Sequence, residues 1–334
     1  MKGSYSVTIK NAVVRYDFVI RRNITIIKGD SATGKTTLVE MVGEYYESGE
    51  ASGIWLNCDR ICMTLSGRDW KKNLDGTQER IIFIDEGNDF VLSNDFAAAV
   101  RNSDNYFVIV TREGLPNLPY SVEEIYGIRE SGKYAALKQI YNEFYRIYGR
   151  EDYTKAVEPE KVIVEDSNAG YEFYNGISGK NGWTASCAGG KSNIFAEVLK
   201  CKSENILVIA DGAAFGAEMS RMVQLMENKK GVILYLPESF EWLILKSGII
   251  RDKDLKVILD HPQEYIDSRE YFSWERFFTR LLVDKTKNSH LKYTKKELNP
   301  VYFHNGYPER ICEVMKPIQL LNGHDLSYRP NYNE

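Results

Sequence analysis

The sequence predicts an α/β protein in which two regions of alternating strands and helices follow one another along the chain. In the first region, short apolar segments such as Ile81–Ile84 alternate with helical segments, and continuous apolar runs of this length are typical of buried parallel strands. A second alternation begins at residue 161. From about residue 260 the chain is aromatic and charged, which favours helices. We therefore expect two parallel sheets and a helical C-terminal region.

Size and composition agree with this organisation. The 334 residues are enough for two domains, and 43% hydrophobic with 27% charged residues is the composition of an ordinary soluble protein. No apolar run could span a bilayer and no secretory signal begins the chain, so we expect a cytoplasmic protein without a membrane partner. The net charge of −4 argues against a globally basic nucleic-acid binder. Five cysteines without a C-x-x-C pair predict free thiols, not zinc ligands.

The first domain is expected over residues 1–130. Residues 5–27 alternate in the manner of strands, which predicts a short sheet or hairpin. A helix is expected after a glycine-rich segment and ends at Ser48-Gly49. The later elements are two buried strands and the helix between them: Ile81–Ile84, Tyr106–Val110 and residues 94–102.

A linker helix is expected over residues 131–160, because five apolar residues there recur at helical spacing: Tyr134, Leu137, Tyr141, Phe144 and Tyr148. The second domain is expected over 161–259, with strands that end near Glu165, Asp211 and Pro237. A helical region over 260–334 completes the chain.

A glycine-rich segment fits the phosphate-binding pattern G-x-x-x-x-G-K-[ST] at every fixed position. Its residues are Gly29, Asp30, Ser31, Ala32, Thr33, Gly34, Lys35 and Thr36. An apolar strand precedes it and a helix that begins with Thr37 follows it, so backbone N–H groups at the helix start would point at a bound anion. We expect Lys35 to reach the terminal phosphates of a nucleotide and the Thr36 hydroxyl to hold Mg²⁺.

Two carboxylates follow the buried strand Ile81–Ile84, at the strand end where α/β sheets place their ligands. Asp85 is expected to complete the Mg²⁺ shell with Thr36, and Glu86 to orient or deprotonate an attacking water. Arg112 follows the next buried strand and is a candidate sensor of a γ-phosphate.

These residues resemble the ASCE class of P-loop ATPases, the branch that includes AAA+, STAND and ABC-type proteins. The glutamate directly after the metal-binding aspartate carries the resemblance, which covers about residues 5–125. It implies that the nucleotide is ATP, since the chain has no N-K-x-D guanine-reading motif. The sequence does not decide whether the protein forms a ring, a dimer or a monomer.

The second domain resembles a Toprim domain of OLD-family nucleases, and more closely the Toprim subunit of the PARIS anti-phage system. One strand ends in Glu165, and a later strand ends in Asp211 with Gly216 at the spacing of a D-x-D-x-x-G pattern. The resemblance implies that Glu165 and Asp211 hold a second Mg²⁺ for phosphodiester cleavage, with Glu165 in a catalytic role. The second aspartate position is Ala213, however, and alanine cannot ligate a metal. Two alternatives stay open: Glu165 and Asp211 hold one Mg²⁺ with help from Asp166 or Glu241, or the site is inactive.

These observations lead to one main functional hypothesis and two alternatives. The main hypothesis is an ATP-binding and ATP-hydrolysing protein that controls a Mg²⁺-dependent nuclease domain in anti-phage defence or nucleic-acid maintenance. In the first alternative, the Toprim-like half is an inactive scaffold or sensor that binds a partner protein or a second copy. In the second alternative, the protein is a small-molecule kinase. The basic stretch Lys285–Lys296 is either a nucleic-acid contact or a solvated face.

Overall fold

The computed structural model describes residues 1–29, 33–131 and 139–321 and shows an α/β protein with two separate sheets. A nine-stranded mixed sheet and a four-stranded parallel sheet lie in different compact units of the chain. The first unit comprises Met1–Gly149 and Asp260–Trp274, and the second comprises Arg150–Leu259 and Glu275–Glu334. The expectation of an α/β fold is therefore confirmed.

The first unit is built on the nine-stranded sheet, whose order is β4-β1-β2-β9-β8-β3-β7-β6-β5. Its strands are β1 (Tyr5–Lys10), β2 (Val14–Ile20), β3 (Ile24–Ile27), β4 (Trp55–Asn57), β5 (Cys62–Thr64), β6 (Ile81–Ile84), β7 (Tyr106–Val110), β8 (Ile125–Glu130) and β9 (Ile140–Arg146). Its helices are α1 (Lys35–Ser48), α2 (Trp70–Leu74) and α3 (Asn94–Arg101). The stretch from β8 to β5 is parallel throughout, and β3, β6 and β7 are buried along their whole length.

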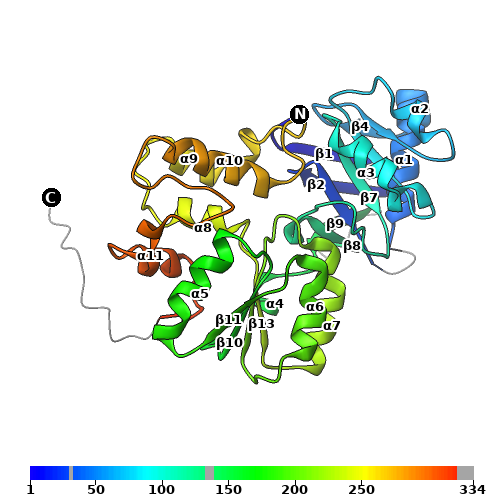
Figure 1. Cartoon of the computed structure of the whole chain (residues 1–334). Helices are drawn as coiled ribbons and strands as arrows, with labels where there is room; N and C mark the ends of the chain where they lie inside the picture. The colour runs from blue at the N-terminus through cyan, green and yellow to red at the C-terminus, as the bar shows by residue number, and fades with distance from the viewer. Residues whose placement is uncertain (30–32, 132–138, 322–334) are drawn as a thin grey trace. The chain divides into compact units, whose positions relative to one another are not determined.

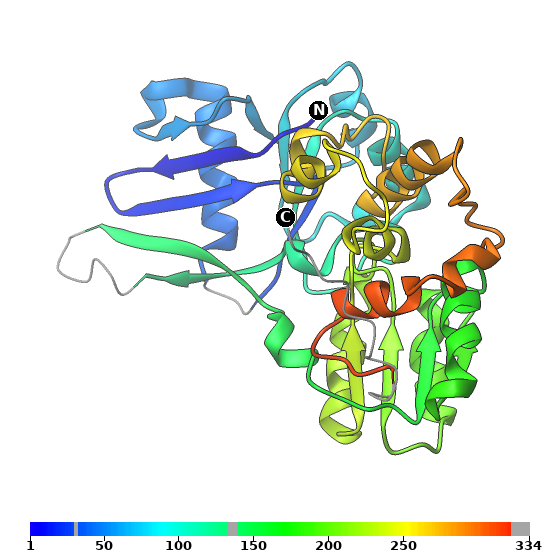
Figure 2. The same ribbon diagram turned by 90° about the vertical axis from the view of Figure 1, so that its left-hand side faces the viewer.

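The linker helix expected within 131–160 is wrong for the part that the structure describes. The chain forms β9 there, which pairs parallel with β2 and antiparallel with β8 (Figure 2). Phe144 of β9 stacks on Phe18 of β2 with ring centroids 4.2 Å apart, so cross-strand aromatic packing overrides the helical spacing. Two of the residues that suggested the helix, Tyr134 and Leu137, lie outside the described residues.

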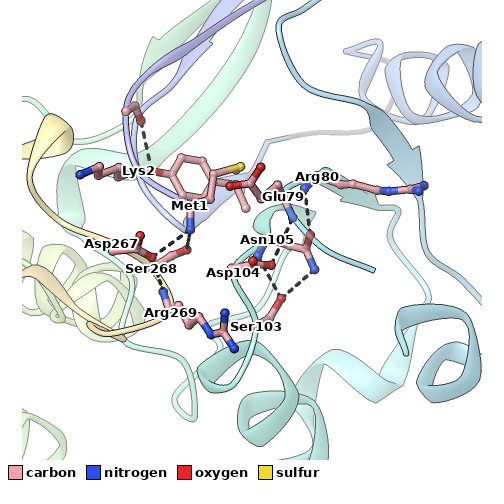
Figure 3. A network of polar contacts seen from close by, with 12 residues as sticks. Met1, Lys2, Glu79, Arg80, Ser103, Asp104, Asn105, Asp267, Ser268 and Arg269 are labelled. Atoms are coloured by element: carbon pink, nitrogen blue, oxygen red, sulfur yellow. Dashed lines mark hydrogen bonds and ion pairs between the residues drawn. The ribbon is translucent and has the colours of Figure 1, made fainter. Parts of the chain in front are cut away.

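Hydrogen bonds join the segment just before β6 to the segment just before β7. The Asn105 side chain is buried, accepts a hydrogen bond from the Arg80 backbone N–H at 2.9 Å and donates one to the Ser103 hydroxyl at 2.8 Å (Figure 3). The Glu79 N–H donates to the Asp104 carboxylate at 3.1 Å. These contacts set the register in which the residues after β6 and β7 leave the sheet.

A segment distant in sequence, Asp260–Trp274, completes the first unit. The Gly3 N–H donates to the Gln263 carbonyl at 2.7 Å, and the Ser268 N–H donates to the Met1 carbonyl at 2.9 Å. Figure 3 shows Ser268 beside Met1. The Arg22 guanidinium lies over the Trp274 ring at 3.6 Å from its centroid, so aromatic as well as backbone contacts hold the segment in place.

The second unit is a four-stranded parallel sheet with the order β11-β10-β12-β13. Its strands are β10 (Lys161–Val164), β11 (Thr184–Cys187), β12 (Ile206–Ile209) and β13 (Val232–Tyr235). The remaining helices of the chain are α4 (Arg150–Tyr153), α5 (Ala169–Asn181), α6 (Lys191–Lys200), α7 (Met219–Asn228), α8 (Phe240–Lys246), α9 (Leu255–Asp260), α10 (Trp274–Thr286) and α11 (Tyr307–Val314). In Figure 1, α5 covers one face of this sheet while α6 and α7 cover the other. Among the described residues, no helix is both long enough and apolar enough to cross a membrane.

A buried ion pair joins Arg22, between β2 and β3, to Glu124, the residue before β8. The Arg22 Nε is 3.7 Å from the Glu124 Oε1, and both side chains are almost fully buried. Burial raises the pKa of Glu124 to about 7, although the charges of Arg22, Arg146 and Arg21 oppose the shift.

This pair makes a prediction about stability and pH. The folded state holds the Glu124 proton more tightly than the unfolded chain does, so the free energy of unfolding should fall as pH rises from about 4.5 to about 7. The slope from this group reaches at most about 1.4 kcal/mol per pH unit. Glu124→Gln should remove that contribution, as measured by urea unfolding at about pH 5 and about pH 7.5. The exposed Glu130→Gln is the control, and equal pH slopes in all three proteins would contradict the prediction.

Candidate functional site

The expected phosphate-binding loop lies between β3 and α1. Gly29 follows the buried strand with a φ of 129°, and Lys35 is the first residue of the helix. The strand–loop–helix context that the sequence predicted is therefore confirmed. Asp30, Ser31 and Ala32, at the centre of the loop, lie outside the described residues.

Gly34, at the end of the loop, is required for two independent reasons. Its φ of 85° is in the left-handed region, and a Cβ placed there would lie 2.7 Å from the Tyr16 hydroxyl oxygen. That hydroxyl donates a hydrogen bond of 2.8 Å to the Gly34 carbonyl. Burial raises the pKa of Tyr16 to about 12, so the hydroxyl keeps its proton as a donor at neutral pH.

Lys35, the first residue of α1, bonds back to residues of the loop that precedes it. Its ammonium donates to the Gly29 carbonyl at 2.9 Å and to the Thr33 hydroxyl at 3.0 Å, and the residue is only 6% exposed. These bonds join Lys35 to Gly29 and Thr33, on either side of the residues that lie outside the described part of the chain. The neighbouring residues Thr36 and Thr37 are exposed on the first turn of α1.

Thr36 and Asp85 come together from distant parts of the chain. Asp85 follows β6, and its Oδ1 lies 3.5 Å from the Thr36 Oγ1. Since β3, β7 and β6 are neighbouring parallel strands, the residues after each of them emerge at the same edge of the sheet. A hydroxyl and a carboxylate side by side provide two oxygen ligands, and Mg²⁺ commonly takes one or two protein ligands beside phosphate oxygens and water.

Glu86 and Arg112 form an ion pair at the same edge. The Arg112 Nε lies 2.6 Å from the Glu86 Oε1, and both side chains are partly exposed. They line a pocket of about 260 Å³ formed by the segments that follow β6 and β7. The structure thus brings together four residues that the sequence assigned to nucleotide chemistry: Thr36, Asp85, Glu86 and Arg112.

In the second unit, Glu165 and Asp211 also meet. They follow the adjacent parallel strands β10 and β12, and the Asp211 backbone N–H donates to the Glu165 Oε2 at 3.0 Å. Burial raises the pKa of Glu165 to about 7, opposed by this hydrogen bond and aided by the charge of Glu275. Burial and the charges of Glu275 and Glu165 also hold the pKa of Asp211 well above its usual range.

Glu275 is a member of this cluster that sequence reasoning missed. It lies in the first turn of α10, where it forms an ion pair with Lys295. Neither residue belongs to the sheet that carries Glu165 and Asp211, and no spacing in the sequence relates them to it. An acidic residue in a first helical turn is common, so the sequence held no signal that could have identified Glu275.

The two candidate metal positions differ in their fit to a divalent cation. Among residues 1–29, 33–131 and 139–321, no three His, Cys, Asp or Glu side chains are grouped so that they could hold a metal ion. Thr36 and Asp85 fit Mg²⁺ because a nucleotide would supply the other oxygens. The second unit would need more ligands of its own, and Ala213, which is 2% exposed, offers none. The residues around Glu165 and Asp211 therefore do not fit the group that the resemblance implies.

The basic stretch Lys285–Lys296 contains both paired and exposed lysines. Lys285 forms an ion pair of 2.5 Å with Asp252, and Lys295 pairs with Glu275. Exposed members of the stretch are Lys287, Lys292 and Lys296.

Comparison with known proteins adds no relative to these observations. No protein-family model, no curated protein and no solved structure matches the chain.

The geometry at Gly34 makes a prediction with a matched control. Gly53 also has a left-handed φ of 73°, but a Cβ there would meet nothing within 4 Å. Gly53→Ala should therefore lower the free energy of unfolding by about 1–2 kcal/mol through backbone strain alone. Gly34→Ala should lower it further, because the buried Tyr16 ring cannot move aside.

Thermal unfolding of the two alanine variants measures this difference. The double variant Gly34→Ala/Tyr16→Phe lacks the Tyr16 hydroxyl oxygen. It should therefore recover part of the additional loss in the free energy of unfolding that Gly34→Ala shows relative to Gly53→Ala. Equal losses at Gly34 and Gly53 would show that the contact with Tyr16 has no influence.

Proposed function

We propose that the first unit binds and hydrolyses ATP as an ASCE-type P-loop ATPase. The observation that carries the proposal is the approach of the Thr36 hydroxyl to the Asp85 carboxylate at 3.5 Å. The two residues are far apart in sequence, and they are those that the motif assigns to one Mg²⁺. Lys35 precedes Thr36 at the start of α1, and its ammonium donates to the carbonyl of Gly29, at the other end of the loop.

Each residue of the site has a role that its position supports. Lys35 and the backbone N–H groups at the start of α1 bind the phosphates. Thr36 and Asp85 hold Mg²⁺, which offsets the negative charge of the phosphates when bound. Glu86 orients a water molecule and accepts its proton. Arg112 provides positive charge for the γ-phosphate as the reaction proceeds.

The ion pair between Arg112 and Glu86 couples two of these roles. The guanidinium orients the carboxylate, which is the group proposed to accept a proton from water. A γ-phosphate would attract the same guanidinium, so Arg112 links the position of Glu86 to the nucleotide. This arrangement favours a hydrolase over a small-molecule kinase, which needs no carboxylate for water.

We propose further that the second unit is Toprim-like and serves as an inactive scaffold or sensor that the ATPase controls. Parallel strands β10 and β12, with Glu165 and Asp211 after them, support the resemblance. Ala213 and the missing third ligand favour the scaffold over the nuclease. A cytoplasmic role in anti-phage defence or nucleic-acid maintenance, with a protein partner, a second copy or nucleic acid as the trigger, rests on the resemblance alone.

Substitutions in the first unit test the ATPase. Lys35→Ala should lose ATP binding, measured by titration calorimetry in the presence of Mg²⁺, because the phosphates lose their central positive charge. Glu86→Gln should still bind ATP but release phosphate at least about a hundredfold more slowly. Glu113→Gln is the matched control, since Glu113 lines the same pocket and has no proposed role. Normal turnover in Glu86→Gln, or unchanged ATP binding in Lys35→Ala, would refute the assignment.

Nucleic-acid cleavage tests the second unit. The protein is incubated with plasmid, single-stranded DNA and RNA, with Mg²⁺ or Mn²⁺, and with or without ATP. We expect that no nuclease activity depends on Glu165, because the cluster lacks the ligands for a catalytic metal. Any cleavage that is observed should therefore persist in Glu165→Ala. Cleavage that depends on Glu165 would establish the nuclease instead.

A further inference from the structure

The turn that carries Asp85 and Glu86 is closed by the side chain of Asn88. The Asn88 amide nitrogen donates a hydrogen bond of 2.9 Å to the Asp85 backbone carbonyl. Glu86 and Gly87 lie between these two residues, and Gly87 has a left-handed φ of 88°, which favours glycine. Glu86 therefore belongs to a tight turn whose two ends are joined by one side chain.

The other end of the same amide holds the turn to a neighbouring segment. The Asn88 Oδ1 accepts a hydrogen bond of 3.1 Å from the backbone N–H of Gly67, in the segment that follows β5. A carbonyl partner requires a donor and an N–H partner requires an acceptor, so these two contacts fix which end of the amide faces which segment. Asn88 thus bridges the segments that follow the neighbouring parallel strands β5 and β6.

Aromatic packing keeps these two segments together beyond the bridge. The Trp70 ring stacks on the Phe90 ring with centroids 5.1 Å apart, and both rings meet the buried Phe96 edge-on. The turn itself is exposed at Glu86 and Gly87. The bridge therefore connects an exposed turn to a packed base.

The position of the Glu86 carboxylate depends on this turn. Glu86 is partly exposed and forms an ion pair with Arg112, whose side chain is more exposed still. Because both side chains reach solvent, the backbone of the turn, and not packing in the core, sets where the carboxylate lies. A carboxylate that takes a proton from water must lie within hydrogen-bond distance of it, and a misplacement of about 1 Å can slow a reaction about a hundredfold.

We propose that Asn88 is a positioning residue of the ATPase site, which sets the Glu86 carboxylate for the attacking water by closing the turn that carries it. The inference deepens the proposed function and rests on ATP hydrolysis by the first unit. Asn88 lines the same pocket as Glu86, but both ends of its amide are bound to backbone groups, so it acts through the turn and not on the substrate. Loss of the bridge should slow hydrolysis and spare nucleotide binding, which depends on Lys35 and Thr36.

Steady-state ATP hydrolysis by the full chain separates these effects. Asn88→Ala should lower kcat about tenfold and leave the KM for ATP within about twofold of its normal value, because the chemical step is affected and binding is not. Asn117→Ala is the matched control. The Asn117 amide also donates to a backbone carbonyl at 2.9 Å, but that carbonyl belongs to Leu92, outside the turn, so kcat should be unchanged.

A double substitution tests whether Asn88 acts through Glu86. Glu86→Gln removes the carboxylate that the turn positions, so adding Asn88→Ala should slow the remaining hydrolysis by less than about twofold. A general structural role of Asn88 would instead lower the rate by the same factor with and without the Glu86 carboxylate.

A second variant keeps the inference testable if circular dichroism shows that Asn88→Ala does not fold. Asn88→Asp retains an acceptor for the Gly67 N–H and loses the donor to the Asp85 carbonyl, so the turn is no longer closed. Its kcat should also fall, with the KM for ATP unchanged.

Three results would overturn the inference and leave the ATPase assignment intact. They are an unchanged kcat in a folded Asn88 variant, an equal fall in kcat in Asn117→Ala, and a further tenfold loss, or about that, when Asn88→Ala is added to Glu86→Gln. Absence of ATP hydrolysis in the unsubstituted protein is a different outcome, because it would refute the proposed function and this inference with it.

Discussion

Both candidate sites depend on one constraint, the alignment of neighbouring parallel strands. Residues that follow such strands leave the sheet at the same edge, whatever their distance in sequence. In the first unit this brings the segment after β3 to those after β7 and β6, and Thr36 reaches Asp85. In the second unit the same constraint brings Asp211 against Glu165. The buried apolar strands thus position polar side chains that they do not themselves contain.

The constraint also gathers like charges, and each unit balances them with a basic residue from another segment. Arg112 pairs with Glu86 in the first unit, where both side chains remain partly exposed. Lys295 pairs with Glu275 in the second, where desolvation is stronger and raises the pKa of Glu165 and Asp211. A partly exposed pair can exchange partners with a ligand at small cost, whereas a desolvated pair resists the removal of either member.

The sequence predicted those parts of the fold and the sites that depend on local patterns. The strand and helix that flank the loop before Lys35, the apolar strand before Asp85 and the strand before Glu165 are each encoded within a few residues, and the structure contains them. Pairing across the chain was not predictable in the same way. Strand β9 was expected to be helical because its apolar residues recur at helical spacing, and the stacking of Phe144 on Phe18, which comes from a distant part of the chain, is not visible in that spacing. Glu275 joins its cluster through tertiary packing alone.

Because Asp260–Trp274 belongs to the first unit, the order of synthesis affects how the chain folds. A chain emerging from the ribosome presents β3, β6 and β7 early, yet the Trp274 ring that covers Arg22 arrives only after the whole sheet of the second unit. Until then, the nascent first unit lacks part of its packing. Synthesis of the second half is thereby a condition for completing the first, and a chain interrupted near residue 259 would be left with an unfinished first unit.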